Sequence, residues 1–180
     1  MSQKNKTRFE VQTIIKSAIT KALTDLSISG WDIREFANPS LQKGNKLILL
    51  NYVRNDRVGW QSGSDVVENQ EFKHREQWIE CQTWHLHIIA KRTDSTTDSS
   101  IIAEDVANNL IAWFNGVGLS YLRNNGMSIN VISNSSILVY DDNSELYQKR
   151  VVIPIRFNVP KVLLSNQVEI SLGEANTYPI

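Results

Sequence analysis

The stretch EQWIECQTWHLHIIAKR, residues 76–92, decides the fold, because it has the composition of one continuous strand. Strands in globular proteins usually span about 3–10 residues, so this one must either project beyond the sheet or bend within it. From Trp84 onward, apolar and polar residues alternate and predict one buried face. Before Gln82 the apolar residues Ile79 and Cys81 fall on the opposite parity. An inserted bulge residue near Gln82 would produce this change.

The residues that precede this strand predict a second strand and an arm. Residues 46–54 contain the apolar run LILL and have the composition of a strand. Residues 55–76 mix charges, glycines and scattered apolar residues without a helical or strand period. They predict either a long loop or an extended β-hairpin arm.

Two amphipathic helices are expected. Thr7 and Glu10 have the spacing of a capping box, and an apolar stripe at helical spacing follows them. The first helix should therefore cover residues 8–28, with Gly30 placed to end it. A second stripe predicts a helix over residues 99–115 that ends at Gly116 or Gly118.

The last third of the chain predicts three strands. A short one covers residues 127–131, and residues 136–140 and 145–159 predict a hairpin around the turn at 141–144. Pro154 has no backbone donor, so its strand should be an edge strand or be bulged there. Residues 165–180 alternate weakly and predict a C-terminal tail, or an arm that orders on a partner.

These elements predict an α+β fold: an antiparallel, in part mixed, β-sheet with two amphipathic helices packed on one face and a long β-hairpin arm at about residues 55–76. A chain of 180 residues is long enough for one domain with a real core, which we place at residues 1–164, with 165–180 as the tail.

The composition argues against several classes of partner. Lysine plus arginine number 19 and aspartate plus glutamate also 19, so net charge recruits neither nucleic acid nor an anionic membrane. The single cysteine, Cys81, cannot form an intramolecular disulfide, and the polar N-terminus differs from a signal peptide. The apolar run at Leu47–Leu50 is far shorter than the roughly 20 residues of a membrane helix. We expect a soluble protein made in the cytoplasm, without a membrane partner.

His85 and His87 lie one residue apart on the long strand, so both imidazoles should share a face. A metal site would need a third ligand, and the other histidine, His74, lies in the arm. Cys81 is roughly 13 Å along the strand from His85, too far for proton transfer. We therefore interpret the two histidines as outward-facing residues of the strand, and Cys81 as buried and inert.

Motifs for a phosphate loop, a dinucleotide fold, a nucleophile elbow or a zinc protease are absent from the sequence. We accordingly expect a protein that is not an enzyme, with no catalytic residues, no cofactor and no metal site.

The arm holds the candidate interface residues. Trp60 is a large aromatic residue among polar ones, so it either meets a partner surface or folds back on its own sheet. The basic residues of the arm are either solvated or form salt bridges to a neighbouring subunit. They are Arg54, Arg57, Lys73, His74 and Arg75.

The order of the elements resembles that of the tail terminator and neck (tail-completion) proteins of tailed bacteriophages. The likeness covers most of residues 8–160. Its features are the opening helix TRFEVQTIIKSAITKAL, the strands KLILLNYV and EQWIECQTWHLHIIAKR that flank the arm, the helix IIAEDVANNLIAWFNG, and the pair SILVYDD and RVVIPIRFNV.

The resemblance implies a homo-oligomeric ring in the neck of the virion, usually a hexamer, that caps the tail tube, ends its polymerisation and docks to head-completion or connector proteins. The tail tube protein is then a partner, and the tail sheath is a further candidate. The genome would pass through the lumen without sequence-specific binding. The family has no catalytic residues to carry over.

Two alternatives stay open. One is another neck adaptor, such as a head-completion or connector-binding protein, or a subunit related to the tail tube. The other is a small metal-dependent hydrolase that uses His85 and His87.

Overall fold

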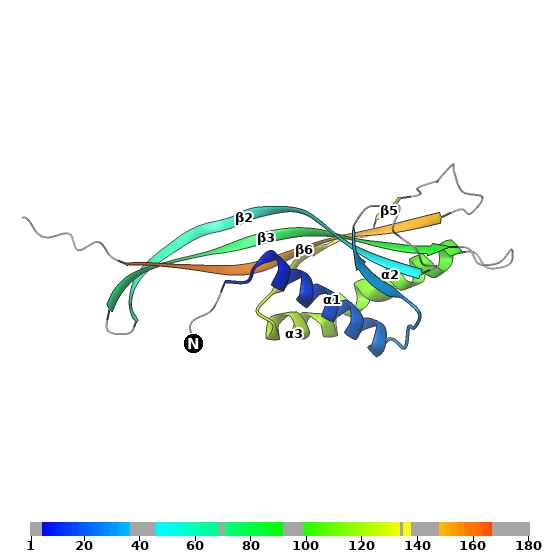
Figure 1. The fold of residues 1–180 in the computed structure, drawn as a ribbon, viewed down its shortest axis with the longest axis horizontal. Helices are drawn as coiled ribbons and strands as arrows, with labels where there is room; N and C mark the ends of the chain where they lie inside the picture. Colours follow the sequence, from blue (N-terminus) through cyan, green and yellow to red (C-terminus); the bar gives the residue numbers. More distant parts are fainter. Residues whose placement is uncertain are drawn as a thin grey trace, which may run out of the picture.

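The computed structural model describes residues 5–36, 46–68, 71–91, 99–133, 135–137 and 148–166. Their elements in chain order are α1 (Arg8–Asp25), β1 (Asp32–Glu35), β2 (Lys46–Glu68), β3 (Glu71–Lys91), α2 (Ser99–Asn115), α3 (Val117–Asn124), β4 (Ser128–Ile132), β5 (Ser135–Ile137) and β6 (Gln148–Asn166) (Figure 1). The strands form one mixed sheet in the order β1-β2-β3-β6-β4, with β5 also paired to β6. β1 is parallel to β2, and the other pairs are antiparallel.

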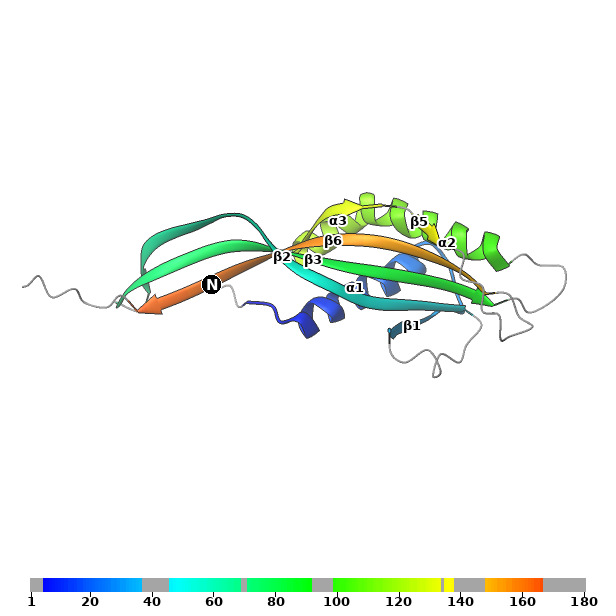
Figure 2. The same cartoon turned by 90° about the horizontal axis from the view of Figure 1, so that it is seen from above.

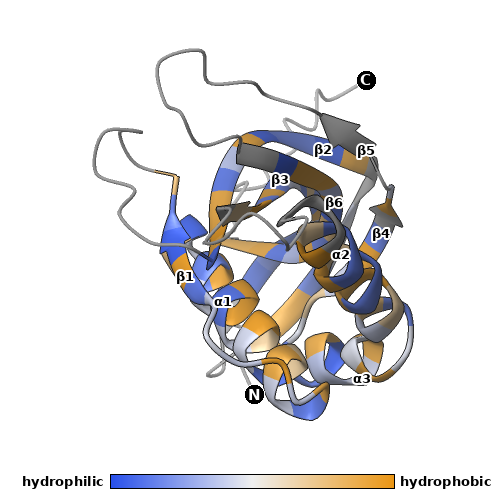
Figure 3. Ribbon diagram, turned by 90° about the vertical axis from the view of Figure 1, so that its right-hand side faces the viewer, coloured by the Kyte–Doolittle hydropathy of each residue, from blue (hydrophilic) through white to orange (hydrophobic). Residues whose placement is uncertain are grey.

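The helices lie on one face of the sheet, which confirms the predicted α+β fold (Figures 1 and 3). Even-numbered residues of β3, among them Trp84 and Leu86, point into the core that the helices cover. Apolar residues of β6 such as Ile153 and Phe157 extend this core, and both are fully buried. Burial of such side chains contributes most of the folding free energy, at about 1.5–3 kcal/mol for each large one.

Beyond the helices, β2, β3 and β6 continue as a three-stranded ribbon, which we call the arm (Figures 1 and 2). β2 and β3 stay paired out to Glu68 and Glu71, and β6 follows β3 out to Asn166. The segment at residues 55–76 is therefore an extended hairpin and not a loop. The prediction that the last strand ends at residue 159 was wrong, because β6 runs seven residues further to Asn166 and forms a third strand of the arm.

The predicted bulge lies in a different strand. β3 pairs with β6 in unbroken register from Lys73 to Lys91, so β3 has no inserted residue near Gln82. The neighbouring strand β2 has two register shifts instead, one between Tyr52 and Arg54 and one between Val58 and Ser62. The apolar pattern of β3 changes near Gln82 because Trp84 and Leu86 lie on the face that the helices cover, whereas Ile79 and Cys81 lie on the other face.

Helix α1 begins as predicted, with the capping box of Thr7 and Glu10 formed in both directions. It ends earlier than expected, at Asp25, and Gly30 does not end it. Ser27 takes the left-handed conformation, with φ of 55°. The backbone N–H of Ile28 donates to the carbonyl of Leu23 at 2.8 Å, which completes a Schellman motif.

Two elements were not predicted, strand β1 and helix α3. α2 ends at Asn115 as expected, and α3 starts two residues later, beyond Gly116. Gly118 lies so close to Trp113 that an added Cβ would come within 2.6 Å of its ring. The close packing of α3 against Trp113 of α2 therefore requires glycine at position 118.

Pro154 lies in an interior strand, not at the edge of the sheet. Its carbonyl accepts from the N–H of Ser133 at 3.1 Å, between the stretches of β6 that pair with β4 and β5. The missing donor of the proline therefore falls where the neighbouring strand is interrupted. The predicted turn at 141–144 and residues 167–180 of the predicted tail lie outside the described residues.

Candidate interaction surface on the sheet and arm

The sheet has a second face, opposite the helices, which we call the helix-free face. It carries the odd-numbered residues of β3 from Lys73 to Ile89, because the even-numbered ones from Trp84 to Ala90 point to the helices. At one end of this face Leu47, Leu49 and Ile89 form a small buried cluster, against which Phe36 packs.

His85 and His87 share the helix-free face as predicted, with ring centroids 6.1 Å apart. The prediction that both point outward was wrong for His87, whose side chain lies beside the apolar cluster and is only 8% exposed. Its ring lies 4.9 Å from that of Phe36. Among the described residues, neither nitrogen of this ring has a hydrogen-bond partner. Burial, together with the smaller effects of the positive charges of Arg150 and His85, lowers the pKa of His87 to about 4.

The described residues around these histidines supply no third metal ligand. Within the described ranges, no three His, Cys, Asp or Glu residues group so as to hold a metal ion. His74 lies in the arm, where its Nδ1 contacts Oδ1 of Asp65 at 3.0 Å. Cys81 is buried as predicted and shares the face of His85, since β3 has no bulge. Four residues of strand, roughly 13 Å, separate the two.

The centre of the helix-free face is polar and basic. Arg54, Thr83 and Arg156 lie directly opposite one another on β2, β3 and β6. The Nε of Arg54 contacts Oδ2 of Asp56 at 3.0 Å. The hydroxyl of Thr83 is buried and has no hydrogen-bond partner among the described residues. A buried hydroxyl without a partner costs free energy. The neighbouring side chain of Arg54 is 57% exposed, so it can meet a polar partner.

The arm carries an apolar row on the same face. Val58, Ile79 and Pro160 lie directly opposite one another on its three strands. Val58 is 41% exposed and Ile79 is 43% exposed, and Pro160 is exposed as well. Residues this exposed and this close together are a candidate contact surface. This row was not predicted from the sequence. The parity change near Gln82 was the available signal, because it places Ile79 on the face opposite to Trp84 and Leu86.

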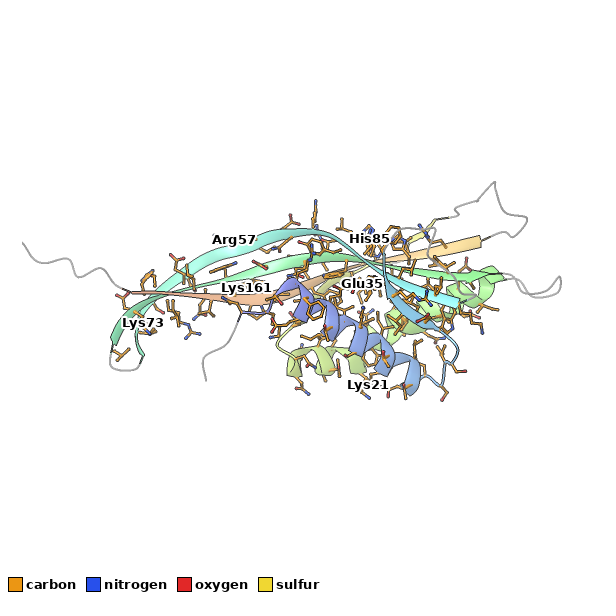
Figure 4. The ribbon with its side chains drawn as sticks, in the orientation of Figure 1. Lys21, Glu35, Arg57, Lys73, His85 and Lys161 are labelled. Carbon is orange, nitrogen blue, oxygen red and sulfur yellow. The ribbon has the colours of Figure 1, made fainter. Side chains whose placement is uncertain are left out.

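The predicted interface residues all lie on the arm or at its base, but on two faces. Arg54, Lys73 and Arg75 belong to the helix-free face, and Arg57 and His74 to the opposite one. Figure 4 shows Arg57 and Lys73 at separate places along the arm. The side chain of Trp60 lies outside the described residues, so its two predicted environments remain predictions.

Arg57 and His74 have partners within the arm. The guanidinium of Arg57 lies 4.7 Å from the ring centroid of Trp78, a cation–π contact. His74 lies between Asp65 and Glu76, and its ring fills the space beside Gly63. These contacts order the helix side of the arm.

The base of the arm is tied to the N-terminal residues. The Nζ of Lys161 contacts Oε2 of Glu80 at 3.3 Å and also donates to the backbone carbonyl of Lys6. The Oδ1 of Asn5 accepts from the backbone N–H of Val162 at 2.7 Å, and the Nδ2 of Asn5 donates to the backbone carbonyl of Val162. Asn5 thereby occupies the backbone groups of β6 where a further strand would pair.

No protein-family model matches this chain, and a search of curated proteins found no significant match. Among the helices that the structure describes, none combines the length and the apolar character needed to cross a membrane.

Proposed function

We propose that this chain is a structural subunit of a tailed-bacteriophage virion, which forms a hexameric ring at the end of the tail tube and ends tube polymerisation. The observation that carries the proposal is the apolar row of Val58, Ile79 and Pro160 on an arm that no described helix covers. The body has its own buried core, whereas this part of the arm exposes apolar side chains.

An exposed apolar row on a projecting ribbon gains free energy when a second surface covers it. In a closed ring each subunit presents two different patches, one to each neighbour. The apolar row of the arm is our candidate for one patch. The polar centre around Arg54, Thr83 and Arg156 is our candidate for the other, because the side chain of Arg54 is exposed there beside Asp56.

The assignment to a phage tail rests on the resemblance of the order of helices and strands to that of tail terminator and neck proteins. In that setting the ring docks to the tail tube protein on one side and to head-completion or connector proteins on the other. Its location is the neck of the virion, and the genome passes through its lumen. The chemistry of His85 and His87 does not favour the hydrolase alternative, since no third ligand lies near them within the described ranges.

The test has two steps, both on the purified full-length chain. Native mass spectrometry should detect a discrete ring, with six copies as the main species. A metal assay on the same sample checks the hydrolase alternative. The ring is then added to polymerising tail tube protein, and the tube lengths are measured by electron microscopy.

We expect the protein to bind tube ends and shorten the tubes. Open-ended stacking of the protein into tubes of its own would instead identify a tube subunit. Binding to head-completion proteins without any effect on tubes would identify another neck adaptor. A metal-bound monomer that ignores tube ends would overturn the proposal.

A further inference from the structure

The two outer edges of the arm differ. Backbone groups of alternate residues point to the same side of a strand. The carbonyl of Pro154 points away from β3, because it accepts from Ser133. Pro160 and Val162 have the same orientation, since β6 pairs with β3 in unbroken register. Pro160 offers no N–H there, and Asn5 occupies both backbone groups of Val162. The β6 edge is thus protected against strand pairing at Pro160 and Val162, near the base of the arm.

Beyond its register shift between Val58 and Ser62, the β2 edge of the arm has no such protection from the described residues. Its last contact with a described strand segment is at Leu50, whose carbonyl accepts from the N–H of Phe36 at 2.8 Å. Beyond that point, residues 51–68 contain no proline, and no described strand pairs with their outer side. By the same alternation, the backbone groups of Gly63, Asp65 and Val67 point outward. An extended segment can pair with an edge of this kind.

The chain itself contains a segment suited to this edge. β6 ends at Asn166, opposite Lys73 near the tip of the arm, and residues 167–180 follow. Their sequence, QVEISLGEANTYPI, alternates apolar and polar residues at Val168, Ile170 and Leu172. Residues 167–172 cover about 20 Å when extended, the length of an ordinary strand. The segment starts at the tip of the arm, where a second copy would be within its reach.

The charges of the two segments are complementary. Residues 167–180 contain Glu169 and Glu174 and no lysine or arginine. The tip of the arm carries Lys73 and Arg75 on the helix-free face, next to β2. A strand laid along β2 would lie two strand spacings, about 10 Å, from Lys73 and Arg75, which attract Glu169 over that distance, while Asp65 of β2 is paired with His74.

We propose that residues 167–172 of one copy add as a β-strand to the β2 edge of a second copy, alongside residues 63–67. This inference rests on the proposed function and names the partner at the arm as a second copy of the chain. Because Pro160 and Asn5 block the β6 edge near the base of the arm, the β2 edge of one arm does not pair with that part of β6 in another. The donated strand makes a head-to-tail contact, which is the contact type that closes into a ring.

Disulfide trapping in the full-length chain tests the proposal. Val67→Cys is combined in turn with Val168→Cys, Ile170→Cys and Leu172→Cys, so that three registers are sampled. Val67 is 65% exposed, and the native Cys81 is buried and does not compete. The matched control pairs Val67→Cys with Val117→Cys, an exposed position on α3. The products of mild oxidation are separated by non-reducing electrophoresis.

We expect at least one pair to give a ladder of covalent oligomers, and the control to stay monomeric. A cross-link within single chains would place the segment on its own β2 edge and overturn the proposal. Absence of any cross-link would overturn it as well. If rings form and cap tubes but none of the cysteine pairs cross-links, the proposal of a donated strand is wrong and the proposed function stands. If the ladder forms but tubes are not capped, the proposed function fails instead.

A second variant gives an independent readout. Ile170→Pro removes a backbone donor from the middle of the donated strand, with Asn176→Pro as the control outside it. We expect Ile170→Pro to raise the concentration for half-assembly about tenfold or more, and the control to leave it unchanged. Equal assembly of both variants would contradict the proposal.

Discussion

The ring of Phe36 lies 4.9 Å from the ring of His87 and helps to separate this histidine from solvent. Phe36 follows strand β1, and His87 lies on β3, directly opposite Leu49. The guanidinium of Arg150 lies 5.5 Å from the centroid of the same phenyl ring. The histidine is therefore held neutral among apolar groups and near a positive charge, and protonating it is unfavourable.

This environment predicts that stability depends on pH. The pKa of His87 is about 4 in the folded chain and about 6.5 in the unfolded chain, so the unfolded state binds the proton more tightly. Stability is complete above pH 6.5 and falls as the pH drops toward 4. The loss from this residue should reach about 2 kcal/mol at pH 5. Urea unfolding at several pH values measures it.

The matched variants for this prediction are His87→Phe and His74→Gln. His87→Phe removes the titrating group and adds an apolar ring beside Phe36, so its stability should vary much less between pH 7 and 5. His74→Gln alters a histidine in the arm and should keep the full dependence. An unchanged pH slope in His87→Phe would mean that other groups titrate.

The apolar row of the arm predicts an assembly defect without loss of fold. Ile79→Lys places a charge in the middle of the row, where it would be buried by a neighbouring subunit. We expect loss of the ring in native mass spectrometry, while the melting temperature shifts by only a few degrees. Val117→Lys, an exposed apolar residue of α3, is the control and should still form the ring. Rings of normal mass from Ile79→Lys would exclude the row from the interface.

The contact between Gly118 and Trp113 predicts a local packing defect. The Cβ of Gly118→Ala would lie 2.6 Å from a ring atom of Trp113 and 2.9 Å from its carbonyl oxygen, and this tryptophan is buried. Overpacking of this kind costs about 1–3 kcal/mol. At Gly116 the nearest atom to an added Cβ is 3.4 Å away, so Gly116→Ala should cost clearly less. Thermal unfolding of both variants compares them, and equal losses would contradict the argument.

The capping box at the start of α1 predicts a smaller effect. Thr7→Ala removes the hydroxyl that accepts from the N–H of Glu10 at 3.2 Å. The expected loss is about 1 kcal/mol in the free energy of unfolding. Thr20→Ala, on an exposed face within the same helix, should be neutral or slightly stabilising, because alanine has the higher helix propensity. Equal losses at both positions would show that the cap is not the cause.

Local patterns in the sequence determined the two longer helices and the long strands. The cap at Thr7 and the spacing from Ile102 to Trp113 each depend on residues within one or two helical turns, so they can be read directly. The alternation from Trp84 to Ala90 likewise predicted which face of β3 meets the helices. The glycines and mixed charges of residues 55–76 left the choice between loop and hairpin open.

Only the tertiary structure decided which residues are covered and by what. Nothing local distinguishes His85 from His87, but Phe36, distant in sequence, packs against the second and not against the first. The third strand of the arm also depends on distant pairing, because residues 160–166 meet β3 about 90 residues away in the chain. Periodicity is a local property that a sequence records, whereas burial depends on long-range contacts that form only when the chain folds.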